Sequence, residues 1–318
     1  MIGLDIGGAN TKAAVVDGGG TTRIVSDPFE VWAHPGELAG AIASVVGRLG
    51  LDAAPVALTT TAELVDVYPS KRDGVLSTDG ELVGLPAARS SPLDCAAANW
   101  VATAMLVARA MPDAILLDCG GTTTDLIPIA GGEVVASGRT DVARLLAGEL
   151  VYTGALRTNV AAVVSHVPIG GRPCPVSSEL FAISADAHLL RGSLSPERCT
   201  CSFPDGRGVS RAEVRARLAR VVCADPGQLA EGDLEAVAAA VADAQVESIA
   251  AGLRRVAARV PAGTRVIAVG VGAFLARAAA HRCGVPIDSD PDLSAVPELS
   301  GTGGEVAAAV ALSVLGRE

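Results

Sequence analysis

Two short segments of the chain place an aspartate two residues before a pair of glycines. The first is Asp5-Ile6-Gly7-Gly8-Ala9-Asn10-Thr11-Lys12 and the second is Asp118-Cys119-Gly120-Gly121-Thr122-Thr123-Thr124-Asp125. Glycine lacks a Cβ, so a phosphate oxygen can approach the backbone and accept hydrogen bonds from its N–H groups. A carboxylate at the end of a strand can bind Mg²⁺, usually through water. Each segment therefore predicts a site for a phosphate-bearing ligand.

Either segment alone has a simpler interpretation, which is a glycine-rich hairpin with a solvated aspartate. Two such segments in one chain favour the functional interpretation, because a diphosphate held from both sides needs two opposed sets of donors. In the first segment Lys12 adds a positive charge, and in the second the threonine hydroxyls add donors.

A third glycine-rich segment is Val269-Gly270-Val271-Gly272, after an apolar stretch and before a predicted helix. A glycine turn that opens a helix can accept an anion or let a ligand ring pack on the backbone. The dinucleotide pattern G-x-G-x-x-G fails here, because Leu275 stands at its last position. No G-x-x-x-x-G-K-[ST] occurs either, so neither a dinucleotide dehydrogenase nor a Walker-type nucleotidase is supported.

The elements that must position these segments alternate between strands and helices. Apolar runs predict strands over 2–6, 11–16, 56–60, 114–118, 126–129 and 265–269. Helical patterns cover 35–49, 93–111, 179–190, 210–222, 232–260 and 305–315. This alternation predicts an α/β fold. The repeated strand–turn–strand unit at Asp5 and at Asp118 indicates two structurally similar halves.

Composition excludes several other classes. The 318 residues are 50% hydrophobic, which is enough for two packed lobes. The formal net charge of −10 argues against a nucleic-acid partner, because such a chain repels phosphate backbones. The longest charge-free apolar run found, Cys95 to Ala108, is shorter than the ~20 residues of a spanning helix, so no membrane partner is expected. The N-terminus lacks the basic region of a signal peptide. A cytoplasmic location is predicted.

Cysteine and histidine usage gives no strong metal or nucleophile pattern. The 7 cysteines include no Cys-x-x-Cys pair, which favours reduced thiols in a cytosol. A zinc site built from Cys174, Cys199, Cys201 and His188 is the weaker alternative, because a second closely spaced pair is missing. The four histidines show no pair at helical spacing, so a catalytic histidine is not predicted.

Several longer strings carry a resemblance to a known family: Thr59–Asp66, Lys71–Val75, Gly148–Gly154, Leu156-Arg157-Thr158, Glu179–Ala182, Ala185-Asp186 and Asp205–Gly208. With the three glycine-rich segments in this order, the chain resembles the actin, sugar kinase and Hsp70 superfamily. Within that superfamily it is similar to the hydantoinase/oxoprolinase-like branch. There it resembles the methanofuran/methylofuran synthase family, also labelled a one-carbon transfer pathway protein linked to tetrahydromethanopterin. It departs from that family at Asp73 and Asn159, where Glu and Pro are expected.

The resemblance implies a fold and a division of the chain. The fold is an α/β, two-lobed actin-like (ribonuclease H-like) architecture with a central cleft. Residues 1–111 would form the N-terminal lobe, with 301–318 packing back on it, and residues 112–300 would form the C-terminal lobe. An Ala- and Val-rich surface would allow a homodimer.

The resemblance also implies a transferase. It would join an aminomethylfuran diphosphate to the phenol oxygen of a tyramine- or tyrosine-type acceptor, release diphosphate and use Mg²⁺, without requiring ATP or another nucleotide. Two alternatives stay open: an ATP-dependent small-molecule kinase or ATPase of the same superfamily, and a non-enzymatic nucleotide-binding regulator. A phenolic acceptor with or without a carboxylate is compatible with the sequence.

The implied roles fall on named positions. Asp5 and Asp118 would bind Mg²⁺ and its water, and Glu63, Asp118 and Lys71 would form the catalytic set with Glu63 as the base. Substrate and phosphate would be bound by Gly7, Gly8, Asn10, Thr11, Lys12, Thr60, Arg72, Gly120, Gly121, Thr122, Thr123, Arg157, Gly270 and Gly272. Four of these residues also have a simpler structural interpretation. Glu63 would cap a helix, Lys71 and Arg72 would lie in a solvated turn, and Arg157 would form a surface ion pair.

Overall fold

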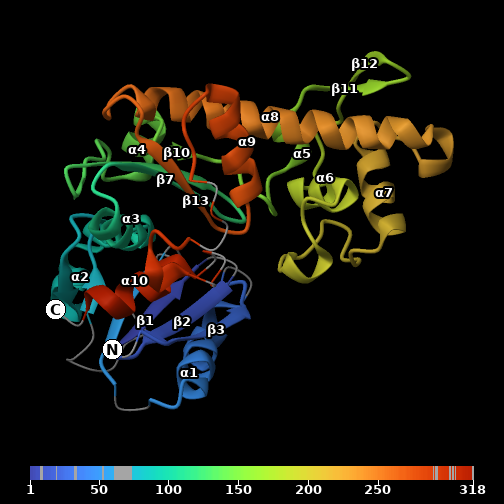
Figure 1. Ribbon diagram of the computed structural model, residues 1–318. Helices are drawn as coiled ribbons and strands as arrows, with labels where there is room; N and C mark the ends of the chain where they lie inside the picture. Colours follow the sequence, from blue (N-terminus) through green and yellow to red (C-terminus); the bar gives the residue numbers. More distant parts are fainter. Residues whose placement is uncertain are drawn as a thin grey trace.

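The computed structural model describes residues 1–7, 10–18, 20–31, 34–51, 54–60, 74–288, 290, 293–300, 302, 304 and 306–316 (Figure 1). Two mixed β-sheets, one formed in the N-terminal part of the chain and one in the C-terminal part, lie on either side of a layer of helices. Strands and helices alternate along the chain, which confirms the predicted α/β class.

The first sheet has the strand order β3-β2-β1-β4-β5-β6. Its strands are β1 (Ile2–Ile6), β2 (Asn10–Val16), β3 (Thr22–Pro28), β4 (Val56–Thr60), β5 (Gly74–Leu76) and β6 (Leu82–Gly84). The first three are antiparallel, and β4 returns parallel to β1 after helix α1 (Leu38–Arg48). Every residue of β1 is buried, which explains why this central strand reads as a continuous apolar run interrupted only by Gly3 and Asp5.

The second sheet repeats this arrangement with the order β10-β8-β7-β13. It contains β7 (Ala114–Cys119), β8 (Thr124–Ala130), β9 (Glu133–Val134), β10 (Leu150–Val151) and β13 (Arg265–Val269), with β9 also paired to β8. β7 and β8 form the hairpin, and β13 runs parallel to β7. In each half the first hairpin strand therefore lies between its antiparallel partner and a later parallel strand, as expected for a ribonuclease H-like repeat.

Helices α3 (Asn99–Ala110) and α10 (Ala307–Leu315) lie between the two sheets. α10 packs on β1, β2 and β4, and α3 packs on α10 and on strands β7 and β8. A Cβ at Gly3 would collide with the carbonyl oxygen of Ala309, so glycine allows the closest approach of helix and strand. These helices bury Trp100, Leu106 and Leu312 in a core shared by both sheets. The division of the chain near residue 111 stays a prediction.

Helices of the C-terminal part of the chain cover the outer face of the second sheet and extend beyond it. The long α8 (Glu231–Ala257) packs on α9 (Ala273–Cys283) near the sheet and on α6 (Ser184–Arg191) and α7 (Arg211–Arg220) farther along (Figure 1). The outer part of α8 also contacts α5 (Val160–Val163) and the hairpin β11 (His166–Ile169)–β12 (Arg172–Pro175). Helices α2 (Leu85–Ser90) and α4 (Asp141–Ala147) complete the described α-helices.

One stretch of α8, Gly232–Ala257, is long and apolar enough to cross a membrane by length and composition. The search for apolar runs in the sequence missed it, because its acidic residues interrupt any charge-free run. Half of its most apolar window is buried inside the protein, where the helix packs on α6 and α9.

Helix starts differ from the sequence-based expectation. The helix predicted from residue 93 begins at Asn99, because Ala96 forms a bridge with Thr60 and Ala97 has a positive φ of 51°. The helix predicted from residue 179 begins at Ser184, because Ile183 pairs in extended form with Asn159. In both cases a residue that is distant in the sequence pairs with a backbone segment that local propensity predicts to be helical.

Candidate active site

The carboxyl ends of β1 and β7 bring the two predicted aspartates into one electrostatic environment. Burial and the negative charges of Asp125 and Asp5 raise the pKa of Asp118 to about 7, and the positive charge of Lys12 opposes that rise. Lys12 Nζ lies 3.4 Å from Asp5 Oδ2. Charges act on one another over about 8 Å at physiological ionic strength, so the electrostatic influence of Lys12 and Asp5 on Asp118 indicates that the two hairpins share one region of the protein.

The turn of the second hairpin presents backbone N–H groups. Gly120 N donates to Thr123 O at 2.9 Å and closes the turn. The carbonyl of Gly120 accepts from Ala155 N, and the carbonyl of Gly121 accepts from Leu156 N and Arg157 N. Within the described part of the chain, no acceptor is found for the N–H groups of residues 121–123. Consecutive free N–H groups of this kind form a concave anion site.

A buried polar network supports this turn from behind. A Cβ on Gly154 would lie 2.5 Å from Thr122 N, so the turn rests directly on the glycine backbone. Gln245 Nε2 donates to Gly154 O at 2.9 Å and to Thr153 Oγ1 at 2.8 Å. His188 Nε2 donates to Gln245 Oε1 at 2.9 Å. Sequence reasoning noticed the Gly154 string only as part of the family resemblance, and it missed Gln245 and His188 as supports.

His188 is fully buried and uncharged near neutral pH. Burial lowers its pKa to about 4, and its hydrogen bond to Gln245 opposes this only in part. Its Nδ1 faces Ser193 Oγ at 3.4 Å. These contacts assign His188 to the packing behind the second turn.

The third glycine segment packs against the base of the second hairpin. Gly272 N donates to Cys119 O at 2.8 Å, and Gly270 adopts a φ of 87°. A Cβ on Gly270 would lie 2.7 Å from Asp118 Oδ1 and would collide with the carbonyl of Cys119. Gly270 therefore lets this segment pack directly on Asp118 and Cys119, and Gly272 lets it pack on Cys119. A role of these two glycines in ligand binding stays a prediction.

Behind Asp118, a second carboxylate is compensated by a buried arginine. Asp125 stands directly across from Asp118 in the hairpin register. Arg144 Nη2 lies 2.8 Å from Asp125 Oδ1, and its guanidinium stacks over the Trp100 ring at 4.2 Å. Burial raises the pKa of Asp125, although the Arg144 charge opposes the rise. Arg144 was missed in the sequence, because nothing local connects it with Asp125.

The other predicted residues divide into described and undescribed positions. Gly8, Glu63, Lys71 and Arg72 lie outside the described residues. Gly7 N donates to Asn10 O at 2.9 Å and closes the first turn, and Thr60 Oγ1 donates to Ile6 O at 3.3 Å beside it. Thr11 is fully buried at the start of β2. Arg157 meets the second turn through its backbone N–H.

The charge around Asp5 and Asp118 is compatible with a bound magnesium ion. The raised pKa of Asp118 reflects burial together with crowded negative charge, which a divalent cation would offset. Among the described residues there is no cluster of three or more His, Cys, Asp or Glu able to hold a metal. Mg²⁺ commonly uses one or two carboxylates and completes its shell with water and substrate phosphate oxygens, so Asp5 and Asp118 fit it.

The residues of the alternative zinc site have other surroundings. Cys199 and Cys201 lie with their sulfurs 3.9 Å apart, Cys174 belongs to β12, and His188 is held by Gln245.

The two sheets, each with a hairpin strand flanked by its antiparallel partner and a later parallel strand, define an α/β protein of actin-like architecture. The sequence profile described as Hydantoinase/oxoprolinase matches residues 59–308, and the chain belongs to this family. This membership confirms the resemblance drawn from the sequence.

Curated relatives are more specific. The chain is 36% identical over 252 residues to the (4-{4-[2-(gamma-L-glutamylamino)ethyl]phenoxymethyl}furan-2-yl)methanamine synthase of Methanocaldococcus jannaschii, covering 74% of each chain. It is 37% identical over 115 residues to the synthase of the same name from Methanococcus vannielii, covering 36% of this chain and 51% of that one. Both relatives are named as enzymes, and the predicted enzyme class is confirmed.

Solved structures that are similar to this one include component A of (R)-2-hydroxyglutaryl-CoA dehydratase from Acidaminococcus fermentans. It is 16% identical, has a TM-score of 0.44 and covers 98% of this chain and 96% of its own. An archaeal actin homologue is 14% identical, has a TM-score of 0.44 and covers 99% of this chain and 98% of its own.

Proposed function

We propose that the chain is a transferase of methanofuran/methylofuran biosynthesis. It joins an aminomethylfuran diphosphate to the phenol oxygen of a tyramine-type acceptor and releases diphosphate. The observation that carries the proposal is the combination of Lys12 and Asp5 from one hairpin with Asp118 from the other, together with the N–H groups of residues 121–123, which have no acceptor among the described residues. The product named for both relatives contains a phenoxymethyl furan, the ether that this reaction forms.

In the proposed reaction one bond to carbon replaces another. The phenol oxygen bonds to the furan-bound methylene carbon, and the bond from that carbon to the diphosphate oxygen breaks. The bonding electron pair leaves with diphosphate, and the phenol proton passes to a base on the protein. Backbone N–H groups fixed around the leaving group lower the barrier, because they meet the charge where it develops without having to reorganise.

Individual residues divide this work. Lys12 and the N–H groups of residues 121–123 bind the diphosphate, and Gly270 lets the third segment close over Asp118. Asp5 and Asp118 would hold Mg²⁺, which when bound supplies positive charge to the leaving diphosphate. Glu63 accepts the phenol proton in this proposal. A cytoplasmic location and the absence of nucleic-acid and membrane partners stay predictions.

The direct test is to incubate the protein with aminomethylfuran diphosphate, Mg²⁺ and each phenolic acceptor, and to detect the ether and the released diphosphate by mass spectrometry. Ether formation that depends on Mg²⁺ is the expected result. If ATP with Mg²⁺ raises the melting temperature, diphosphate does not, and no ether appears, then the kinase or ATPase alternative replaces this proposal. If the protein turns over neither a nucleotide nor the diphosphate substrate, the result would favour the non-enzymatic regulator.

A further inference from the structure

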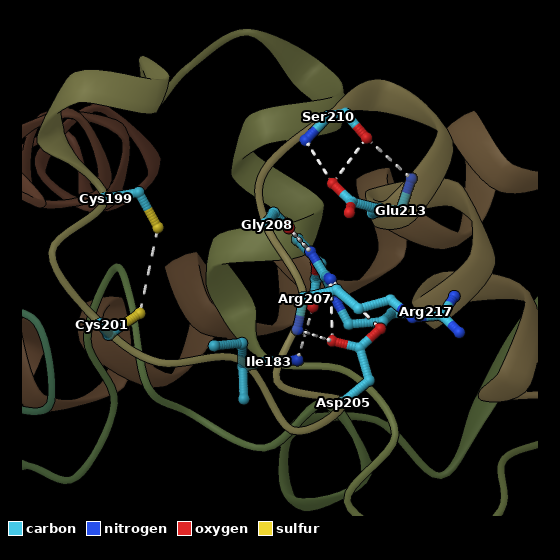
Figure 2. Close-up of polar contacts among 10 residues, drawn as sticks. Ile183, Cys199, Cys201, Asp205, Arg207, Gly208, Ser210, Glu213 and Arg217 are labelled. Carbon is cyan, nitrogen blue, oxygen red and sulfur yellow. Dashed lines mark hydrogen bonds and ion pairs between the residues drawn. The ribbon is translucent and has the colours of Figure 1, made fainter.

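Two cysteine thiols face each other in the irregular segment between α6 and α7, and the proposed reaction uses neither of them (Figure 2). Cys199 Sγ lies 3.9 Å from Cys201 Sγ, and both side chains are partly buried. A disulfide has an S–S length of about 2 Å, so the sulfurs need to approach by only about 2 Å more. Two positions of extended chain span at most about 7 Å, which is the upper limit for the Cα atoms of a disulfide. The pair is therefore close enough to be oxidised within one chain.

The segment that carries the thiols is anchored on both sides. Before them, a short 3₁₀ turn (Pro196–Arg198) is closed by the hydrogen bond from Cys199 N to Pro196 O at 3.1 Å. After them, the Phe203 ring stacks against the Arg217 guanidinium at 3.9 Å. Arg217 is itself held by Asp186, because its Nε donates to Asp186 Oδ1 at 2.8 Å. These anchors keep the two thiols together although the segment is irregular.

The surroundings of the two thiols make them unequal. A hydrogen bond from the Cys201 thiol lowers the pKa of Cys199, and the Arg217 charge adds to this effect while burial and Asp186 oppose it. The same pairing and burial raise the pKa of Cys201, which the Arg157 charge opposes only in part. The thiolate is the nucleophile in thiol–disulfide exchange, so Cys199 is expected to react first and Cys201 second.

The residues directly before and after the thiol pair contact two other parts of the protein. Arg198 Nη2 donates to the carbonyl oxygen of Val271 at 3.4 Å, and Val271 belongs to the third glycine segment. Ser202 Oγ donates to Glu30 Oε2 at 3.2 Å, in the N-terminal part of the chain. Both contacts start one residue away from a cysteine. A change in the separation of the sulfurs therefore acts directly on the residues that make them.

We infer that Cys199 and Cys201 form a redox-active dithiol, which a low-molecular-weight disulfide oxidises to an intramolecular disulfide. The Cys199 thiolate attacks one sulfur of the reagent, forms a mixed disulfide and releases a first thiolate. Cys201 then loses its proton and attacks Cys199 Sγ, which releases a second thiolate. The protein gives up two electrons and two protons, and the reagent takes them up and leaves as two thiols.

Oxidation changes the neighbouring glycine segment in this inference. Closing the sulfurs draws the segment together and breaks the contacts of Arg198 and Ser202. Val271 then loses a support, and it lies between Gly270 and Gly272, which pack on Cys119 next to Asp118. The oxidised protein is therefore the less active form. This consequence for turnover rests on the proposed function, whereas the oxidation itself does not.

The chemical test is oxidation of the whole protein with oxidised glutathione, followed by blocking of free thiols and digestion with trypsin. Cleavage after Arg198 and Arg207 releases residues 199–207, a peptide that contains these two cysteines and no other. Mass spectrometry should show that this peptide has lost two hydrogen atoms and regains them with a reductant. A parent protein whose peptide carries two blocked thiols after oxidation would overturn the inference.

Single substitutions test the order of the two steps. Cys201→Ser should retain glutathione on Cys199, because no second thiol resolves the mixed disulfide. Cys199→Ser should react at least about tenfold more slowly than Cys201→Ser, since the remaining thiol is the weaker nucleophile. Cys223→Ser removes an exposed cysteine outside the segment and is the control, in which the disulfide should still form. Equal rates for Cys199→Ser and Cys201→Ser would overturn the assigned order.

Two further measurements separate this inference from the proposed function. Hydrogen exchange at residues 270–275 should be severalfold faster in the oxidised parent than in the reduced parent, whether or not ether is formed. Ether formation should be about tenfold slower after oxidation and should recover with a reductant, because small displacements beside reacting groups lower turnover strongly. The double substitution Cys199→Ser with Cys201→Ser should be insensitive to the oxidant.

The outcomes distinguish the two ideas. A disulfide with faster exchange, but no ether in either state, would support the dithiol and reject the transferase. Ether formation without any disulfide in the oxidised parent would reject the dithiol and leave the transferase standing. A disulfide with unchanged exchange and unchanged turnover would overturn the effect of oxidation on the glycine segment.

Discussion

The two hairpins share a backbone plan but differ in the charge that faces the aspartate. In the first, Asp5 stands across from Lys12, and in the second, Asp118 stands across from Asp125. The first hairpin therefore brings a cation to the turn. The second brings a crowded carboxylate together with N–H groups that have no acceptor in the described part of the chain. One backbone repeat has been specialised twice, with positive charge in one half and directed donors in the other.

The supports of the two hairpins differ as well. The first hairpin packs on α10 through Gly3, and Ser313 of α10 also accepts from Val16 N and donates to Met1 O. The second turn rests on Gly154 and the chain of Gln245 and His188. The contacts with α10 lie along the strands of the first hairpin, whereas the buried hydrogen bonds behind the second turn fix the direction of individual groups of that turn. The second turn should therefore be the more demanding half for catalysis.

The largest expected effect is that of Asp118→Asn. We expect kcat for ether formation to fall by about three orders of magnitude, because the metal loses a ligand next to the leaving group. The melting temperature should not fall, since burial and like charges make the ionised carboxylate costly at this position. Asp79→Asn, at an exposed ion pair with Arg139, is the control. Near-normal turnover in Asp118→Asn would remove this residue from the site.

The pH dependence of unfolding should test whether buried His188 stabilises the second turn. Because the pKa of His188 is lowered to about 4 in the folded protein, the unfolded chain binds a proton first as pH falls from about 6.5. The stability that neutral His188 contributes is thus present above pH 6.5 and lost toward pH 4, by up to about 3 kcal/mol. Unfolding of the parent and of His188→Gln is measured across this range. Parallel curves for the two proteins would contradict the prediction.

Gly154→Ala should push the second turn without straining the backbone, since this glycine does not have positive φ. The added methyl would meet Thr122 N and displace the donors, at a cost of about 2 kcal/mol in diphosphate binding, or tens of fold. Diphosphate inhibition constants report the change. The control is Gly227→Ala, where nothing lies within 4 Å of the added Cβ, and it should not change the diphosphate inhibition constants. An unchanged constant in Gly154→Ala would mean that the turn does not bind diphosphate.

The smallest effect is expected for Lys12→Gln. Its ammonium is partly exposed and 3.4 Å from Asp5, so its loss should weaken diphosphate binding only about tenfold and leave stability nearly unchanged. The same inhibition assay measures it. A loss greater than that in Gly154→Ala would reverse the comparison and make the first hairpin the stronger anion binder.

Most of the fold could be predicted, because its elements are encoded locally. The apolar runs at 2–6, 114–118 and 265–269 form the central strands, and the glycine turns lie where the sequence places them. The strands β3, β5, β6, β9, β10, β11 and β12 were not predicted. All of them except the seven-residue β3 are only two to four residues long, and β3 carries no apolar run. Such short strands are stabilised by their partners more than by their own pattern.

The sequence by itself determined the paired aspartate–glycine turns and the strands that carry them, because strand, turn and carboxylate lie within a dozen residues of one another. Only the tertiary structure decided which charges meet. Arg144 reaches Asp125, Arg217 reaches Asp186, and Ser202 reaches Glu30 across 172 positions of the chain. No local period records such contacts, because they arise when separately folded elements pack and buried charges must find partners.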